Sequence, residues 1–302
     1  MTSPAAQDVR RTFGLVGVPT SAGSHNAGQE RAPAAWREHG LVDALGRAGA
    51  QVTDHGDLAV RTHRPSPRVE GVRDADRVRA TCLEVADAVA RVAGAGEVPL
   101  VLGGDCTTTL GVVAGLRRTG RVGLLYLDGD VDLNRPELSG SGVLDTMGTT
   151  HLLGGGSAAL ADLGQDGPLL RPEEVELFGF DPAELDEQQW TTLTRLRLSA
   201  TPAPEVRDDP AGSASTAWSR LARAADRVVL HVDVDVLDTG AFPLANFPHF
   251  NGLALDELSV CLRTLAQGVG LAAVVVTEVN PSHDPDGSLL SALRDVLVAA
   301  LA

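Results

Sequence analysis

Short apolar runs alternate along the chain with longer segments in which apolar residues recur every three or four positions. The short runs predict buried strands, and the longer periodic segments predict helices that each bury one face. Strands are predicted at residues 12–18, 51–53, 98–102, 122–127, 175–180, 228–233 and 271–278, and helices at 32–40, 72–95, 107–116, 143–153, 182–198, 214–225, 255–268 and 288–301. Strands that alternate with helices predict an α/β protein whose mostly parallel sheet is covered on both faces.

Two of the predicted strands end in alternating aspartates. They are Asp128, Asp130 and Asp132 after the strand at 122–127, and Asp233 and Asp235 at the end of the strand at 228–233. On an extended backbone, side chains two residues apart point to the same side, and carboxylates gathered there repel each other unless a cation lies among them. Since ligands of such sheets bind beyond the carboxyl ends of the strands, the pattern predicts one shared site for a hard divalent metal ion.

Composition and charge narrow the partners and the location. The chain has 302 residues, 43% of them hydrophobic, and no Pro/Ser-rich linker, which favours a single domain over residues 1–302. A net charge of −15 argues against nucleic acid and anionic membranes as partners and favours a cationic substrate. Three widely spaced cysteines indicate a reducing cytoplasm, and neither a signal sequence at residues 1–10 nor a membrane-spanning run is expected.

Four short motifs occur in an order that resembles the ureohydrolase family of arginase, agmatinase and their relatives. The motifs are Gly103-Gly-Asp-Cys106, Asp128-Gly-Asp-Val-Asp132, Asp233-Val-Asp-Val-Leu-Asp238 and Thr277-Glu-Val-Asn-Pro281, and residues 28–41 and 252–253 extend the similarity over nearly the whole chain. The resemblance implies a three-layer α/β/α sandwich, two bound manganese ions and hydrolysis of a guanidinium or amidine carbon–nitrogen bond. It also implies a homo-oligomer, commonly a trimer or hexamer.

The same resemblance assigns roles to individual residues. Metal ligands of the family match Cys106, Asp128, Asp130, Asp132, Asp233 and Asp235, and the glutamate that contacts the guanidinium matches Glu278. Three functional histidines of the family's pattern are replaced here, two metal ligands by Cys106 and Asp130 and the proton shuttle by Asp145. The family's substrate-orienting arginine-aspartate segment is replaced by residues 179–182.

These replacements change the expected metal chemistry. One thiolate and five carboxylates carry a formal charge of −6 against +4 from two divalent ions, whereas two neutral imidazoles in place of Cys106 and Asp130 would give −4. The extra negative charge weakens the ions as Lewis acids and leaves less hydroxide at neutral pH. A thiolate also shifts the preference from manganese toward zinc or iron, and the short Asp130 side chain leaves open whether two ions, one or none bind.

Each site residue also has a simpler interpretation. An acidic stretch alone is often a solvated loop, Cys106 is suited to packing a strand-to-helix turn, Asp145 to capping a helix, and Glu278 to a surface position at a strand end. Four histidines near the motifs are candidates to replace the missing ones, namely His151, His231, His249 and His283. For each alone, a structural role is the simpler interpretation. His231 is the first candidate because, two residues before Asp233, it shares that residue's side of the strand.

The sequence therefore predicts a metal-dependent hydrolase that acts on a guanidino or amidino small molecule through an altered metal site. Glu278 is expected to hold the cationic end of the substrate, and Asp145 is the candidate proton shuttle. Two alternatives remain open. One is a catalytically inactive arginase-like protein with a binding or assembly role, and the other is a hydrolase of N-hydroxyguanidine or amide substrates.

Overall fold

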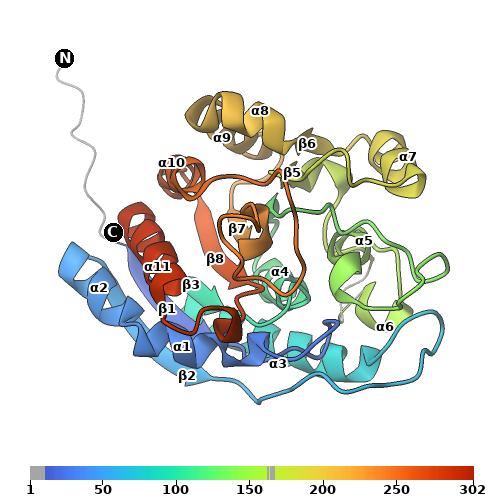
Figure 1. Ribbon diagram of the computed structural model, residues 1–302, viewed down its shortest axis with the longest axis horizontal. Helices are drawn as coiled ribbons and strands as arrows, with labels where there is room; N and C mark the ends of the chain where they lie inside the picture. Colours follow the sequence, from blue (N-terminus) through green and yellow to red (C-terminus); the bar gives the residue numbers. More distant parts are fainter. Residues whose placement is uncertain (1–10, 162, 164–166) are drawn as a thin grey trace.

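The sheet brings the four sequence motifs together. A computed structural model describes residues 11–161, 163 and 167–302, and residues 1–10, where no signal sequence is expected, lie outside this part. The described strands form one eight-stranded parallel sheet in the order β2-β1-β3-β8-β7-β4-β5-β6 (Figure 1). Strands β3, β8, β7 and β4 are therefore neighbours in the middle of the sheet, and each of the four motifs begins at or just after the end of one of them.

The strands and helices have the following bounds. The strands are β1 (Thr12–Gly17), β2 (Gln51–Asp57), β3 (Val98–Leu102), β4 (Gly123–Leu127), β5 (Val175–Phe178), β6 (Ser199–Thr201), β7 (Val228–Asp233) and β8 (Leu271–Thr277). The helices are α1 (Ala32–Glu38), α2 (Leu41–Ala48), α3 (Ala75–Gly94), α4 (Thr108–Arg117), α5 (Gly148–Leu152), α6 (Ala158–Ala161), α7 (Glu187–Leu196), α8 (Ala203–Asp208), α9 (Pro210–Leu221), α10 (Leu255–Ala266) and α11 (Ser288–Leu301). Short 3₁₀ turns include η2 (Asp145–Met147) and η4 (Val234–Val236).

Side chains alternate between the two faces of the sheet, and each face is covered by its own helices. In β3, Leu100 and Leu102 belong to one buried core and Val101 to the other, as the two-residue period of a strand requires. The first core is closed by α1, α2 and α8 to α11, and the second by α3 to α6 (Figure 1). The predicted three-layer α/β/α sandwich with a parallel sheet is confirmed.

The edges of the sheet differ most from the prediction. Strand β2 continues to Asp57, beyond the predicted end at residue 53, and most of its side chains are exposed. As the terminal strand it pairs with β1 and needs no apolar face, so its sequence shows no alternation. Its carboxylates Asp54 and Asp57 accept hydrogen bonds from Arg37 of α1 at 2.7 and 2.6 Å. Strand β6, at the other edge, has only three residues and is absent from the prediction.

Helix α7 begins at Glu187, although the helix is predicted from residue 182. Asp186 caps it, because its Oδ1 accepts from the backbone N–H of Gln189 at 2.7 Å while the Gln189 side chain accepts from the Asp186 N–H at 3.0 Å. Residues 181–186 therefore form a turn, which leaves Glu184 and Asp186 near the carboxyl edge of the sheet.

None of the helices in the described part of the chain has the length and apolarity needed to cross a membrane. The three cysteines, Cys82, Cys106 and Cys261, are buried free thiols. The single-domain organisation over residues 1–302 stays a prediction.

Candidate metal and active site

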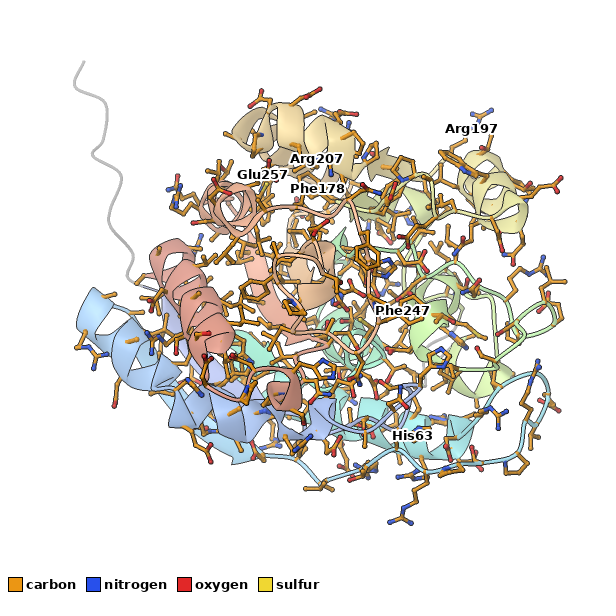
Figure 2. The ribbon with its side chains drawn as sticks, viewed as in Figure 1. His63, Phe178, Arg197, Arg207, Phe247 and Glu257 are labelled. Atoms are coloured by element: carbon orange, nitrogen blue, oxygen red, sulfur yellow. The ribbon has the colours of Figure 1, made fainter. Side chains whose placement is uncertain are left out.

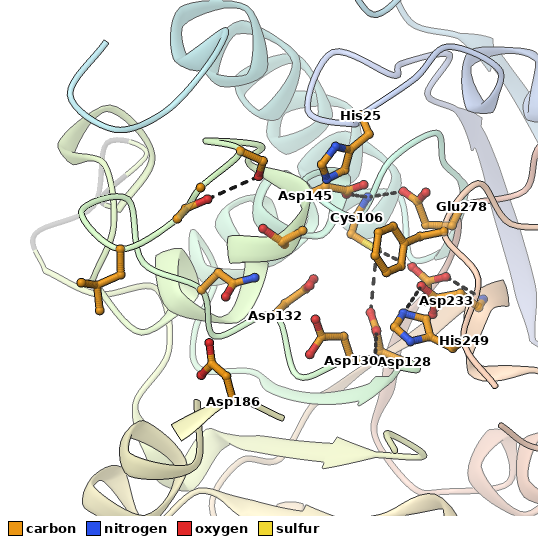
Figure 3. A pocket seen from close by; sticks show the side chains of 18 of the residues that line it. His25, Cys106, Asp128, Asp130, Asp132, Asp145, Asp186, Asp233, His249 and Glu278 are labelled. Atoms are coloured by element: carbon orange, nitrogen blue, oxygen red, sulfur yellow. Dashed lines mark hydrogen bonds and ion pairs between the residues drawn. The ribbon is translucent and has the colours of Figure 1, made fainter. Parts of the chain in front are cut away.

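A pocket of about 460 Å³ lies at the carboxyl edge of the four central strands (Figure 3). All eight site residues predicted from the sequence line it, namely Cys106, Asp128, Asp130, Asp132, Asp145, Asp233, Asp235 and Glu278. Parallel strands bring their carboxyl ends to one edge of the sheet, so residues far apart in the sequence meet there. The solvated-loop interpretation of the acidic stretch is wrong for Asp128 and Asp132, which are 3% and 6% exposed.

The aspartates enter the pocket by turns and not by continued strands. Strand β4 ends at Leu127, after which Asp128 Oδ1 accepts a hydrogen bond from the Asp130 N–H at 2.7 Å. Asp132 has φ +48°, in the left-handed region. The expectation that an extended backbone aligns the three carboxylates is therefore wrong, because side-chain-to-backbone hydrogen bonds bend the chain first. Asp233 makes the same turn, since its Oδ1 accepts from the Asp235 N–H at 2.8 Å.

Four buried side chains from three strand ends gather at the floor of the site. Ligand atoms of Cys106, Asp128, His231 and Asp233 all lie within 4.8 Å of one another. The Cys106 sulfur is 2.5 Å from Asp233 Oδ2 and 3.9 Å from Asp128 Oδ2. Cys106 thus faces the aspartates. From the sequence, packing of the strand-to-helix turn and metal ligation are equally open roles for this residue.

His231 lies beneath the pocket, on the side of β7 that the sequence predicts. Its Nε2 is 3.7 Å from the Cys106 sulfur and 3.8 Å from Asp128 Oδ2, and its Nδ1 is 2.7 Å from Thr109 Oγ1. The imidazole stacks on Tyr126 with ring centroids 4.0 Å apart and an interplanar angle of 4°. Burial lowers the pKa of His231 to about 3, so the imidazole is neutral and can offer a lone pair.

Glu278 and Asp145 form the opposite wall and converge on Cys106. The Cys106 N–H donates to Asp145 Oδ1 at 2.8 Å and lies 3.2 Å from Glu278 Oε1. Gln29 Nε2 donates to Glu278 Oε2 at 2.8 Å and to Ser24 Oγ at 2.9 Å, and Ser24 Oγ is 3.2 Å from Asp145 Oδ2. The loop after β1 thereby fixes both carboxylates.

Two simpler interpretations from the sequence are wrong. Glu278 is only 5% exposed and has φ +63°, so it is no surface residue at a strand end. Asp145 is the first residue of η2, but its carboxylate accepts from Cys106 and Ser24 and caps no helix.

The remaining predicted ligands are held apart from this group. Asp130 Oδ1 accepts from its neighbour Val131 N–H at 2.6 Å and from Gln189 Nε2 at 3.1 Å. Asp132 Oδ2 accepts from the Tyr126 hydroxyl at 2.5 Å. Asp130, Asp132 and Asp235 all line the pocket, but none of the three belongs to the close groups of potential ligands found in the described part of the chain.

His249 enters the pocket from the loop before α10. Its Nδ1 is 2.6 Å from Glu184 Oε2 and its Nε2 is 3.5 Å from Asp235 Oδ2. Burial opposes its protonation, yet the carboxylates of Asp235, Asp128 and Glu184 outweigh burial and raise the pKa of His249 to about 10. Protonated His249 therefore places a positive charge opposite Asp235.

Gly129 leaves the space that His249 occupies. A Cβ added at Gly129 would lie 2.7 Å from the Asp235 carbonyl oxygen and 2.7 Å from His249 Cδ2. We expect Gly129→Ala to lower the free energy of unfolding by about 1–3 kcal/mol, measured by urea denaturation. Adding His249→Ala should recover part of the loss, since the cavity accepts the new methyl group. Equal stability of Gly129→Ala and the unchanged protein would contradict this packing.

The other two candidate histidines have structural roles. His151 Nδ1 lies 2.7 Å from the Met147 carbonyl oxygen, and its Nε2 accepts from the Ser157 N–H at 3.1 Å. His283 is exposed, with Nδ1 2.9 Å from the Ala245 carbonyl oxygen. The pocket lining includes neither residue.

The carboxylates of the pocket carry unfavourable electrostatic energy. Burial raises the pKa values of Asp128, Asp132 and Asp233 well above the usual carboxyl range, and neighbouring carboxylates raise them further. The same two causes raise the pKa of Glu278 well above its usual value. A cation, or protons, must offset so much buried negative charge.

Several residues in the pocket or next to it have no clear signal in the sequence. The rings of His25 and Phe247 stack with centroids 6.1 Å apart, and Phe247 meets His249 at 5.3 Å. Phe247 is 51% exposed and is labelled in Figure 2. Gln29, which holds Glu278, lies on the loop after β1, and only the observed order of strands places that loop beside β3.

Known proteins share this fold and sequence pattern. The model of the arginase family matches residues 11–301. The arginase of Brevibacillus brevis is 30% identical over 280 residues, which cover 91% of this chain and 93% of that protein. The native structure of Bacillus caldovelox arginase superposes with a TM-score of 0.86 at 27% identity, covering 97% and 98% of the two chains. A formimidoylglutamase of Bacillus subtilis, 18% identical with a TM-score of 0.77, shares the fold.

Fold, pocket and relatives together define a metal-dependent amidinohydrolase of the arginase or agmatinase kind. The chain belongs to the arginase family, and the predicted ureohydrolase resemblance is confirmed.

Proposed function

We propose that this protein hydrolyses a carbon–nitrogen bond of a cationic guanidino or amidino small molecule, with a divalent metal in an altered site. The observation that carries the proposal is the buried Glu278 carboxylate, which faces the same pocket as the group of Cys106, Asp128 and Asp233. A pocket that joins a site for a metal with a carboxylate for a cation suits this reaction. Cytoplasmic location and a homo-oligomer, trimer or hexamer, stay predictions.

The residues present fit a divalent metal ion. Carboxylates whose pKa values are raised by burial and mutual repulsion are stabilised by a cation placed among them. Asp128, Asp132, Asp233 and Asp235 would hold the metal, with Cys106 and Asp130 completing or modifying the set, and manganese is the ion that the family resemblance implies. A bound divalent ion supplies Lewis acidity and lowers the pKa of water at the site.

The pocket is suited to a cation. Of the residues described, those that line it include eight acidic side chains and no arginine. Glu278 accepts from Gln29 Nε2 at 2.8 Å through Oε2 and from the Cys106 N–H at 3.2 Å through Oε1. Each oxygen keeps a second lone pair for a planar guanidinium, which a carboxylate binds with two parallel hydrogen bonds. The carboxylate is 5% exposed, so such a pair is shielded from water and is stronger than one at the surface.

Asp145 is the residue proposed to hold and move a proton. Burial, together with the charge of Asp105, raises the pKa of Asp145 to about 7, near the value that favours exchange of a proton at neutral pH. Its two oxygens accept from Cys106 N–H and from Ser24, so the carboxyl group has one orientation toward the pocket.

Incubation of the purified protein with manganese, zinc or iron and a panel of guanidino compounds should release urea or a substituted urea. Glu278→Gln keeps the size of the side chain and removes its charge, so we expect a rise in KM together with a fall in kcat of about a hundredfold or more. Absence of turnover with every metal and substrate, in protein shown by circular dichroism to be folded, would reject the proposal.

A further inference from the structure

We propose that Cys106, Asp128, His231 and Asp233 together form one metal position at the floor of the pocket. This position has mixed sulfur, nitrogen and oxygen donors and prefers zinc to manganese. The inference deepens the proposed function, since it names the ligands and the ion of the same site. It adds a ligand, His231, to the set that the family resemblance implies. It rests on the positions of four buried side chains, which are between 0% and 3% exposed.

The four ligand atoms are spaced much as a tetrahedral ion requires. Bonds of about 2.3 Å to sulfur and about 2.0 Å to nitrogen or oxygen place the ligand atoms of a tetrahedral zinc site about 3.3–3.6 Å apart. The Cys106 sulfur is 3.7 Å from His231 Nε2 and 3.9 Å from Asp128 Oδ2, and these two atoms are 3.8 Å apart. The pair of Cys106 and Asp233, at 2.5 Å, must open by about 1 Å, and all the ligand atoms of the group lie within 4.8 Å of one another.

His231 is held as a ligating imidazole is held. A metal-bound histidine uses one ring nitrogen for the ion, and a hydrogen bond from the other nitrogen fixes the ring. Here Nδ1 pairs with Thr109 Oγ1 at 2.7 Å, and the flat face of the ring lies on Tyr126. These two contacts aim Nε2 at the Cys106 sulfur and Asp128, where it is buried from water.

The donor types decide which ion the site prefers. Manganese favours carboxylate, carbonyl and water oxygens in octahedral geometry, whereas thiolate with imidazole favours zinc in tetrahedral geometry. An imidazole donor adds a ligand without adding negative charge to a position already crowded by carboxylates. One sulfur donor and one nitrogen donor beside two carboxylates therefore move this position away from manganese.

Cobalt(II) is the probe, because a cobalt–thiolate bond gives an ultraviolet charge-transfer band that is independent of turnover. We expect the band in the full-length protein loaded with cobalt, and we expect Cys106→Ser to abolish it. Cys261→Ser is the matched control, since that buried thiol lies in α10, 3.5 Å from the Pro210 carbonyl oxygen, and should leave the band unchanged. A protein that binds cobalt without the band would overturn the assignment of Cys106.

The role of His231 as a ligand is tested by measuring the affinity of the protein for zinc and manganese. In competition dialysis against equal manganese and zinc, the unchanged protein should retain zinc, and His231→Gln should lower the zinc affinity by about a hundredfold or more. Thr109→Val keeps the helix and removes the hydroxyl that holds Nδ1, so about a tenfold loss is expected even if His231→Gln does not fold. Exposed His283 provides the control variant His283→Gln. Retention of manganese over zinc, or unchanged zinc affinity in Thr109→Val, would overturn the proposal.

These measurements separate the ligand set from the reaction. Zinc preference and a cobalt–thiolate band without turnover of any guanidino compound would reject the proposed function and leave the site assignment standing. Turnover with manganese and no cobalt–thiolate band would do the reverse.

Discussion

Asp233→Asn is expected to lower kcat/KM on the best guanidino substrate by about a thousandfold or more. Asp233 is fully buried and lies against the Cys106 sulfur, so an ion held among these side chains, as proposed, would contact its carboxylate. A metal ion supplies several kcal/mol of transition-state stabilisation, and each 1.4 kcal/mol corresponds to a factor of ten in rate. Loss of the carboxylate should remove most of that contribution.

The same variant should have the opposite effect on the stability of the metal-free protein. Burial and the charges of Asp235, Asp128 and Glu278 raise the pKa of Asp233, so the ionised carboxylate destabilises the folded state at neutral pH. We therefore expect metal-free Asp233→Asn to be at least as stable toward urea as the unchanged protein, while the stabilisation gained on adding metal is lost.

Asp226→Asn, at an exposed turn before β7, is the matched control and should alter neither activity nor the response to metal. A folded Asp233→Asn protein that keeps its activity and its metal-dependent stability would show that the ion lies elsewhere.

The sequence predicted which residues meet at the pocket better than it predicted the backbone that brings them there. Apolar runs followed by acidic residues were enough to locate the ends of β3, β4, β7 and β8, because a parallel sheet gathers its carboxyl ends at one edge. The period of a strand was also enough to place His231 on the same side as Asp233. These inferences depend only on local geometry, which the sequence specifies.

Contacts between distant loops could not be predicted. His249 meets Glu184 and Asp235 because the turn before α7 and the loop before α10 fold over the same strand ends. Gln29 reaches Glu278 across 249 positions of sequence separation. Neither pair shares a motif or a period, so nothing local in the sequence records the contact. The exposed edge strand β2 was predicted only over residues 51–53 for a related reason, since it has no buried face to create a pattern.

Gly104→Ala is expected to cause the largest loss of stability, more than about 3 kcal/mol in the free energy of unfolding measured with urea. A Cβ at this position would lie 1.6 Å from the Thr20 carbonyl oxygen and 2.6 Å from its carbonyl carbon. Both obstacles are backbone atoms, and neither neighbour can retreat. The Asp105 N–H donates to that same carbonyl at 3.2 Å, and the Gly104 carbonyl accepts from the Glu278 N–H at 2.9 Å.

Gly46→Ala, in the exposed face of α2, is the matched control for this substitution. A Cβ at Gly46 meets no atom within 4 Å, so alanine should raise the free energy of unfolding by roughly 0.5–1 kcal/mol through its higher helix propensity. If the two substitutions change the free energy of unfolding in opposite directions, the close approach of the loops after β1 and β3 determines the effect at Gly104. The loss of a glycine as such would change both in the same direction. Because that approach also carries Cys106 to its place beside Glu278, a stable Gly104→Ala protein would contradict the backbone arrangement on which the pocket depends.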